Sequence, residues 1–199
     1  MSTIIGTRRW TVLAALFLAS FFGSALVAQE VESIEVSGFE GHQQEASNWC
    51  WAASIQSLFA SKGLDVDQSA IVAAAYGQVV NATAPGFEGT LRLLHTVVVD
   101  IDGTEWEVHA RAGASYPDAR WLLQRFRNDE PVMIWFHDEY ANHSIVIHGG
   151  TYYVNAAGSF MGWQSIVAYD PLLDTDMTID ARNIPRYVYG TFEVSIRER

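Results

Sequence analysis

Residues 44–54 read QEASNWCWAAS, and this stretch decides how the rest of the chain is interpreted. Ser47 or Asn48 offers a helix N-cap, and residues 49–60 carry strong helix formers at apolar spacing. We therefore expect Cys50 at the amino end of a helix. Unpaired backbone N–H groups and the helix dipole favour negative charge there, and hence the thiolate, which is the reactive form of cysteine.

A second group with catalytic potential lies just upstream. Gln44 is six residues before Cys50, so its side-chain amide is placed to join the Cys50 backbone N–H in an oxyanion hole. Cys50 is the only cysteine, which excludes an intramolecular disulfide and a cysteine-rich zinc site. The alternative is that Cys50 is a small buried apolar residue without a chemical role.

Length, composition and net charge restrict the classes of protein to which this chain can belong. The chain has 199 residues, of which 49% are hydrophobic and 18% charged, so it is long enough for one folded domain with its own core. The formal net charge of -11 argues against a nucleic-acid partner and against adsorption to an anionic lipid surface, since both need clustered cations.

The amino terminus has the pattern of a signal peptide. Arg8 and Arg9 precede the apolar run 10–22, and small residues follow up to Ala28. We expect residues 1–28 to be a signal peptide and residues 29–199 to form the exported domain, secreted or periplasmic. The alternative is an uncleaved membrane anchor, because residues 10–28 are just long enough to span a bilayer.

The remaining chain divides into a helical part and a strand-rich part. The alternation of apolar and polar residues predicts a strand at 31–36. Apolar residues at helical spacing predict helices at 49–60, 68–76, 90–98 and 117–128, and Asp67 is the expected cap of the second. The valines of the third helix also suit a strand. Strands are predicted at 132–136, 144–147, 152–154, 165–169 and 187–196, separated by Gly149-Gly150, Gly158 and Pro171. This order indicates an α+β fold whose two halves face each other across a crevice.

A cysteine nucleophile needs an imidazole within hydrogen-bond reach and a group that orients that imidazole. The six histidines are His42, His95, His109, His137, His143 and His148. Residues 142–149 (NHSIVIHG) hold two of them on a predicted strand, and residues 166–171 (IVAYDP) form another apolar strand that ends in Asp170.

Together these residues resemble papain-like cysteine peptidases. The likeness rests on Gln44, on the six-residue spacing from Gln44 to Cys50, and on Cys50-Trp51-Ala52 and Ser54. It is greatest to the compact bacterial branch of the family, which holds double-glycine leader peptidases and plant-pathogen effector proteases. The Cys-Gly-Ser-Cys of plant and lysosomal papains is absent. The resemblance implies a papain-like fold, with a nucleophile helix in an N-terminal helical half packed on a C-terminal antiparallel β-sheet.

The same resemblance assigns roles to four residues. It implies Cys50 as nucleophile, Gln44 as oxyanion donor, His143 as base and Asp170 as the orienting residue. His148 is the alternative base, but five residues separate the two histidines, so an ideal strand points them to opposite faces. Asn155 is a weaker substitute for Asp170 as the orienting residue. Between His143 and Asp170, residues 152–164 are expected to form an extra hairpin.

The activity implied is hydrolysis of peptide bonds through a thioester, by a monomer acting on a protein or peptide, with no cofactor and no metal. The alternatives are an amide hydrolase or transferase acting on cell-wall or isopeptide bonds, and a catalytically silent binding module. A metal at His137, Asp138 and Glu139 is disfavoured because adjacent residues do not converge. The acidic stretch 174–180 is expected to be a solvated loop.

Overall fold

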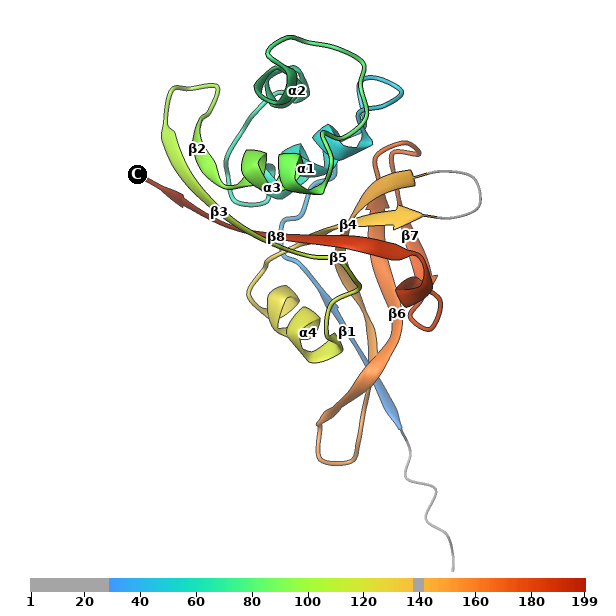
Figure 1. Cartoon of the computed structure of the whole chain (residues 1–199). Coiled ribbons are helices and arrows are strands. Elements are labelled where there is room, and N and C mark those ends of the chain that lie inside the picture. The colour runs from blue at the N-terminus through green and yellow to red at the C-terminus, as the bar shows by residue number, and fades with distance from the viewer. Residues whose placement is uncertain (1–28, 138–141) are drawn as a thin grey trace, which may run out of the picture.

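The computed structural model describes residues 29–137 and 142–199, so the expected signal peptide lies outside the described residues (Figure 1). Helices occupy α1 (Cys50–Ala60), α2 (Gln68–Tyr76), α3 (Phe87–Leu94) and α4 (Ala119–Arg127), with a 3-10 turn at Ile184–Arg186. The strands are β1 (Glu30–Glu35), β2 (Thr96–Val99), β3 (Glu105–Gly113), β4 (Val132–His137), β5 (Asn142–Val154), β6 (Phe160–Asp170), β7 (Thr175–Asp180) and β8 (Val188–Glu198).

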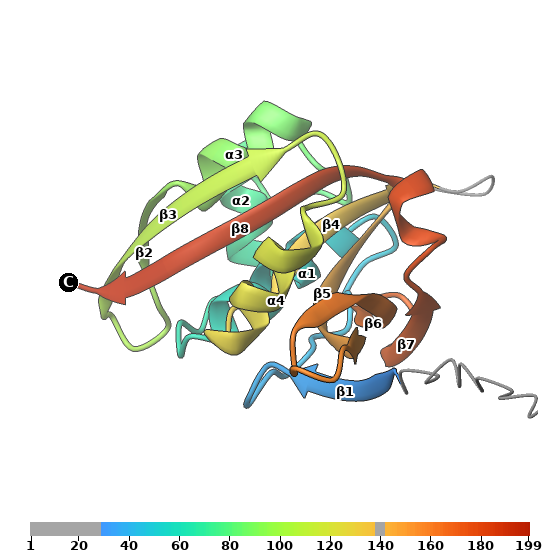
Figure 2. The same cartoon turned by 90° about the horizontal axis from the view of Figure 1, so that it is seen from below.

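The strands form one antiparallel sheet in the order β2-β3-β8-β4-β5-β6-β7, and β1 pairs with the second half of β5. Helices α1, α2 and α3 cover one face of the sheet, and α4 covers the other (Figures 1 and 2). The predicted α+β class, with a helical half packed on a large antiparallel sheet, is therefore confirmed.

Strand β4 shows why the core has two sides. Met133 and Trp135 join the hydrophobic cluster under α1, whereas Val132 and Ile134 join the cluster under α4. Successive side chains of a strand point to opposite faces, so a strand covered on both faces reads as a continuous apolar run.

Helix α1 begins one residue later than predicted, at Cys50, and every residue from Trp51 to Phe59 is buried. The predicted capping by Ser47 or Asn48 is wrong: Trp49 is the N-cap residue, and no side chain caps the helix. The two polar side chains instead hydrogen-bond Asn81, in the loop after α2. This loop therefore takes up the groups that the sequence offered for capping.

Two elements differ from the prediction in the helical half. Helix α3 ends at Leu94, and the valines after it form strand β2, which pairs with β3. The sequence reading did not predict β3, although its residues alternate between apolar and charged over Glu105–Gly113. Helix α2 has the predicted bounds, which confirms that prediction.

Two further predictions in the strand-rich half are wrong. The acidic stretch 174–180 forms edge strand β7, which pairs with β6 through Thr175–Asp180. Gly149-Gly150 does not separate two strands but lies inside the continuous strand β5. A Cβ atom at Gly150 would overlap the carbonyl oxygen of Ser165, so the glycine allows β6 to approach β5 closely.

Gly150→Ala tests this close approach. We expect it to destabilise the fold by about 2 kcal/mol, because a rigid backbone oxygen must move to admit the methyl group. The matched control is Gly113→Ala in β3, where the added Cβ meets nothing within 4 Å. The urea midpoint should fall for the first variant and stay within error of wild type for the second. Equal midpoints for Gly150→Ala and wild type would contradict the packing described.

Candidate active site

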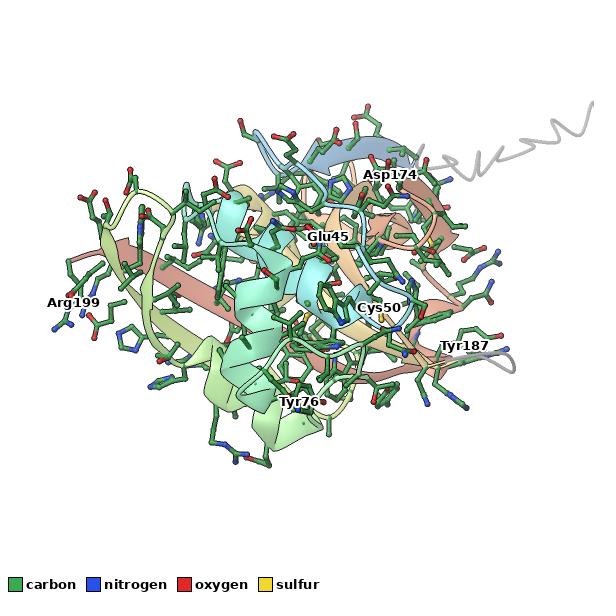
Figure 3. The ribbon with its side chains drawn as sticks, turned by 90° about the horizontal axis from the view of Figure 1, so that it is seen from above. Glu45, Cys50, Tyr76, Asp174, Tyr187 and Arg199 are labelled. Carbon is green, nitrogen blue, oxygen red and sulfur yellow. The ribbon has the colours of Figure 1, made fainter. Side chains whose placement is uncertain are left out.

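A cleft of about 470 Å³ lies at the amino end of α1. Its walls come from the loop before α1, from Thr83–Gly86 and from the ends of β4, β5 and β8. Cys50 is the first residue of α1, and its side chain lines this cleft (Figure 3). Gln44 and His143 line the same cleft, so three of the four candidate residues share one cavity.

His143 lies between Cys50 and Asp170. Its Nε2 atom is 2.6 Å from Oδ1 of Asp170, and its ring also hydrogen-bonds the Cys50 side chain. Because Nε2 faces the carboxylate, Nδ1 is the ring nitrogen left for the sulfur. The structure thus brings a thiol, an imidazole and a carboxylate into one continuous hydrogen-bonded series.

The electrostatics of this series favour a protonated imidazole. Burial alone lowers the pKa of His143, but hydrogen bonds to Asp170 and Cys50 and the negative charge of both groups outweigh it and raise the pKa to about 9. Burial raises the pKa of Asp170, and the hydrogen bond and charge of His143 outweigh that effect and lower it. A neutral solution therefore favours imidazolium facing carboxylate.

Asp170 is held rigidly at the end of β6. Its side chain is buried, and Oδ1 also accepts a hydrogen bond from the Leu172 backbone N–H at 2.8 Å. The next carbonyl, that of Pro171, accepts from the backbone N–H of Gln44 at 3.0 Å. The end of β6 therefore positions both the carboxylate and the loop that carries Gln44.

Gln44 has one amide hydrogen available to the cleft. Its Nε2 donates one hydrogen to the carbonyl of Ala46 at 2.9 Å, and a primary amide carries two. The backbone N–H of Cys50 is the second candidate donor, because the first residues of a helix have no intrahelical acceptor. These two donors have the character of an oxyanion hole.

Gln68, which the sequence reading missed, holds the Gln44 loop. It is 1% exposed, accepts a hydrogen bond from the Glu45 backbone and donates to the carbonyl of Gln43 and to the side chain of Gln56 on α1. It therefore clamps the backbone on both sides of Gln44. The only signal in the sequence was a polar residue at the first position of a predicted helix, which is too common to single out.

A buried hydroxyl pair joins the two elements that carry the sulfur and the imidazole. Ser144 donates to Ser54 at 3.0 Å, and both side chains are almost completely buried. Ser54 is one turn after Cys50 on α1, and Ser144 follows His143 on β5. The pair therefore fixes how far the helix lies from the strand at this point.

Of the other candidate groups, the described ones do not line the cleft. His148 is buried against Phe39 and bonds Asp176, whereas Asn155 closes the turn between β5 and β6. His137 bonds Asn142, and Asp138 and Glu139 lie outside the described residues. Within the described ranges, no group of three or more His, Cys, Asp or Glu side chains is arranged to hold a metal ion.

The fold is similar to that of two solved structures. The first is the peptidase domain of Streptococcus ComA, a bi-functional ABC transporter involved in a quorum-sensing pathway. Its TM-score is 0.50 at 11% identity, over 81% of this chain and 99% of that one. The second is a C39-like peptidase from Bacillus anthracis, with a TM-score of 0.56 at 13% identity, over 84% of this chain and 100% of that one.

The fold is therefore similar to that of papain-like cysteine peptidase domains. More particularly, the structural neighbours are C39-like peptidase domains, as expected from the nucleophile segment. At this identity the likeness establishes the fold alone. No protein-family model matches the sequence, and no curated protein matches it either. In the part of the chain that the structure describes, no helix is long and apolar enough to cross a membrane.

Asp170→Asn tests the electrostatic coupling. We expect the pKa of His143 to fall below about 9, because the hydrogen bond and negative charge of Asp170 are lost while burial and the interaction with Cys50 remain. The ring of His143 should be followed by NMR titration between pH 4 and pH 10, a range chosen to bracket the pKa of free histidine, about 6.5. Asp176→Asn, beside His148, is the matched control and should leave the His143 titration unchanged. An unaltered titration in Asp170→Asn would refute the coupling.

Proposed function

We propose that this chain is an exported cysteine peptidase in which Cys50, His143 and Asp170 form the catalytic triad and Gln44 assists. The observation that carries the proposal is the position of the His143 ring, which bonds the Cys50 side chain and lies 2.6 Å from Asp170. A nucleophile, a base and an orienting carboxylate in this order are the parts that acyl transfer needs.

The proposed reaction has two steps. The Cys50 thiolate attacks the substrate carbonyl carbon, and the oxyanion that forms accepts hydrogen bonds from Gln44 and from the Cys50 N–H. His143 gives its proton to the leaving amine as the C–N bond breaks, which leaves a thioester. A water molecule then gives a proton to His143 and attacks the thioester, releasing the acid and restoring the thiolate.

The proposed location and partners follow from the sequence and the cleft. We propose that residues 1–28 direct export and are removed, leaving residues 29–199 as a monomer outside the cytosol. Among the residues that the structure describes, those that line the cleft have neutral side chains apart from His143 and the titratable groups Cys50 and Tyr189. A cleft of this kind suits uncharged segments of a protein or peptide substrate.

Cys50→Ser and His143→Ala test the triad. We expect each to lower peptide hydrolysis by at least about a thousandfold, because members of one triad act as a unit. In His143→Ala, labelling of the single thiol by iodoacetamide should also slow, since the imidazolium no longer favours the thiolate. His109→Ala, on the distant strand β3 with a half-exposed side chain, is the control and should retain activity.

The substrate panel decides between the alternatives. It should contain a peptide library and purified cell-wall fragments, with the products identified by mass spectrometry. Cleavage of cell-wall amides or formation of isopeptide bonds would replace the peptidase by a related hydrolase or transferase. Slow labelling of Cys50 in the wild-type protein, equal to that in His143→Ala, would favour a catalytically silent binding module.

Gln44→Ala separates oxyanion binding from nucleophile activation. We expect kcat to fall by about a hundredfold to a thousandfold, which is the usual effect of losing one such donor. The rate of iodoacetamide labelling should hardly change, because alkylation forms no oxyanion. Parallel losses in both measurements would show that Gln44 acts on the sulfur or on folding and not on the oxyanion.

A further inference from the structure

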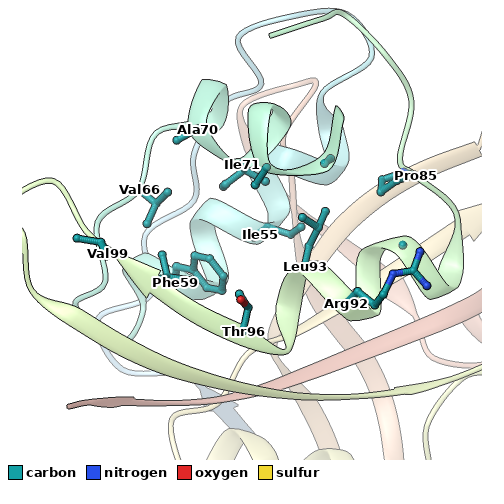
Figure 4. Close-up of a pocket in the computed structure, with 14 residues that line it drawn as sticks. Ile55, Phe59, Val66, Ala70, Ile71, Pro85, Arg92, Leu93, Thr96 and Val99 are labelled. Atoms are coloured by element: carbon teal, nitrogen blue, oxygen red, sulfur yellow. The ribbon is translucent and has the colours of Figure 1, made fainter. Parts of the chain in front are cut away.

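A second cavity lies beside the middle of α1, whereas the catalytic cleft lies at the amino end of that helix. It measures about 550 Å³ and is bounded by α1, α2, α3 and β2 (Figure 4). Cavities that bind small molecules usually measure about 300–1,000 Å³, so this one has the size of a ligand site. Neither the proposed catalytic residues nor the residues that position them line it.

The wall of this cavity is apolar. Ile55 and Phe59 of α1 and Leu93 of α3 contribute large side chains, whereas α2 contributes mainly alanines, among them Ala70 and Ala74. Four positions along a helix bring residues to the same face, so these two short side chains leave a hollow that larger residues would fill. Of the described residues that line the cavity, only Arg92 and Thr96 have polar side chains.

Arg92 is the one charged residue among the described residues that line the cavity. It is exposed in the last turn of α3, and its guanidinium lies near Gly89 and Pro85 at one end of the cavity (Figure 4). Among residues 29–137 and 142–199, no carboxylate lies within 4 Å of it. Four other arginines each pair with a carboxylate, whereas Arg111, Arg120, Arg127 and Arg186 have no such ion pair among the described residues, so the position of Arg92 at the apolar cavity is what sets it apart. In a chain with 23 acidic and 12 basic residues, an arginine without such a partner is available for an external anion.

We propose that this cavity binds a single-chain amphiphile with a carboxylate headgroup, a medium-chain fatty acid. The hydrocarbon chain lies between α2 and β2, where it leaves water and covers the apolar wall. The carboxylate pairs with the planar guanidinium of Arg92 through two parallel hydrogen bonds. The negative net charge of the protein repels anions at long range, so burial of the chain supplies most of the affinity and Arg92 selects the headgroup.

This inference does not depend on the proposed peptidase activity. Helix α1 separates the two cavities, with Cys50 lining one and Ile55 the other. They meet at a single loop, where Pro85 lines the apolar cavity while Ala84 and Gly86 line the catalytic cleft. Alkylating Cys50 therefore blocks the catalytic cleft and leaves the apolar cavity open, which distinguishes the two sites experimentally.

Isothermal titration calorimetry of the full folded chain with decanoate, below its micellar concentration, tests the proposal. Decanoate should bind once per chain, and Arg92→Ala should weaken it about fivefold while leaving decanol binding unchanged. Arg120→Ala, an exposed arginine on α4, is the matched control and should bind decanoate as wild type does. Ala74→Phe should abolish binding of both probes by filling the hollow.

Several outcomes would overturn the proposal. These are absence of decanoate binding, equal loss in Arg120→Ala and Arg92→Ala, or loss of binding after Cys50 is alkylated. A concentration-dependent dimer that Ala74→Phe disrupts would make a second copy of the chain the occupant. Circular dichroism should establish that each variant is folded. If Ala74→Phe is not, Ala70→Leu blocks the same face, and retained decanoate binding in that folded variant would count against the site.

Discussion

The contact between the amino end of α1 and the first residues of β5 constrains the rest of the structure. Cys50 is carried by a helix, and His143 by a strand of the central sheet, 93 residues later in the chain. Their side chains meet only if helix and strand pack at one fixed distance. The buried Ser54–Ser144 hydrogen bond holds that distance from within the interface, and its loss would leave a buried hydroxyl without a partner.

The loop before α1 depends on the same contact. The backbone N–H of Gln44 donates to the carbonyl of Pro171, which follows the strand that carries Asp170. The side chain of Gln68 binds the backbone of both residues next to Gln44. The thiol, the imidazole with its carboxylate, and the Gln44 loop are therefore each held by a different element, namely α1, the sheet and α2. Such cross-bracing by buried polar groups keeps a site rigid, since each group needs its partner to offset desolvation.

The local motif was predictable from the sequence, and the network around it was not. Residues 44–54 show helix formers and an isolated cysteine, and residues 142–149 show a histidine before an apolar run, so helix, strand and candidate residues could be named. Gln68 and the Ser54–Ser144 pair escaped because their partners are distant in sequence. Capping was mispredicted because Asn81 binds the polar groups of Ser47 and Asn48, a tertiary contact that overrides local preference.

The tryptophans on both sides of Cys50 explain how its sulfur can face a cleft while its neighbours are buried. The indole N–H of Trp49 donates to the carbonyl of Val80, and that of Trp51 donates to Ala82. Both rings are buried, so the backbone on each side of Cys50 is fastened to the loop after α2. Because that loop continues into Thr83–Gly86, the segment that fixes the proposed nucleophile also walls the candidate active-site cleft and, through Pro85, the apolar cavity. A displacement of this loop would therefore reach the start of α1 through two hydrogen bonds.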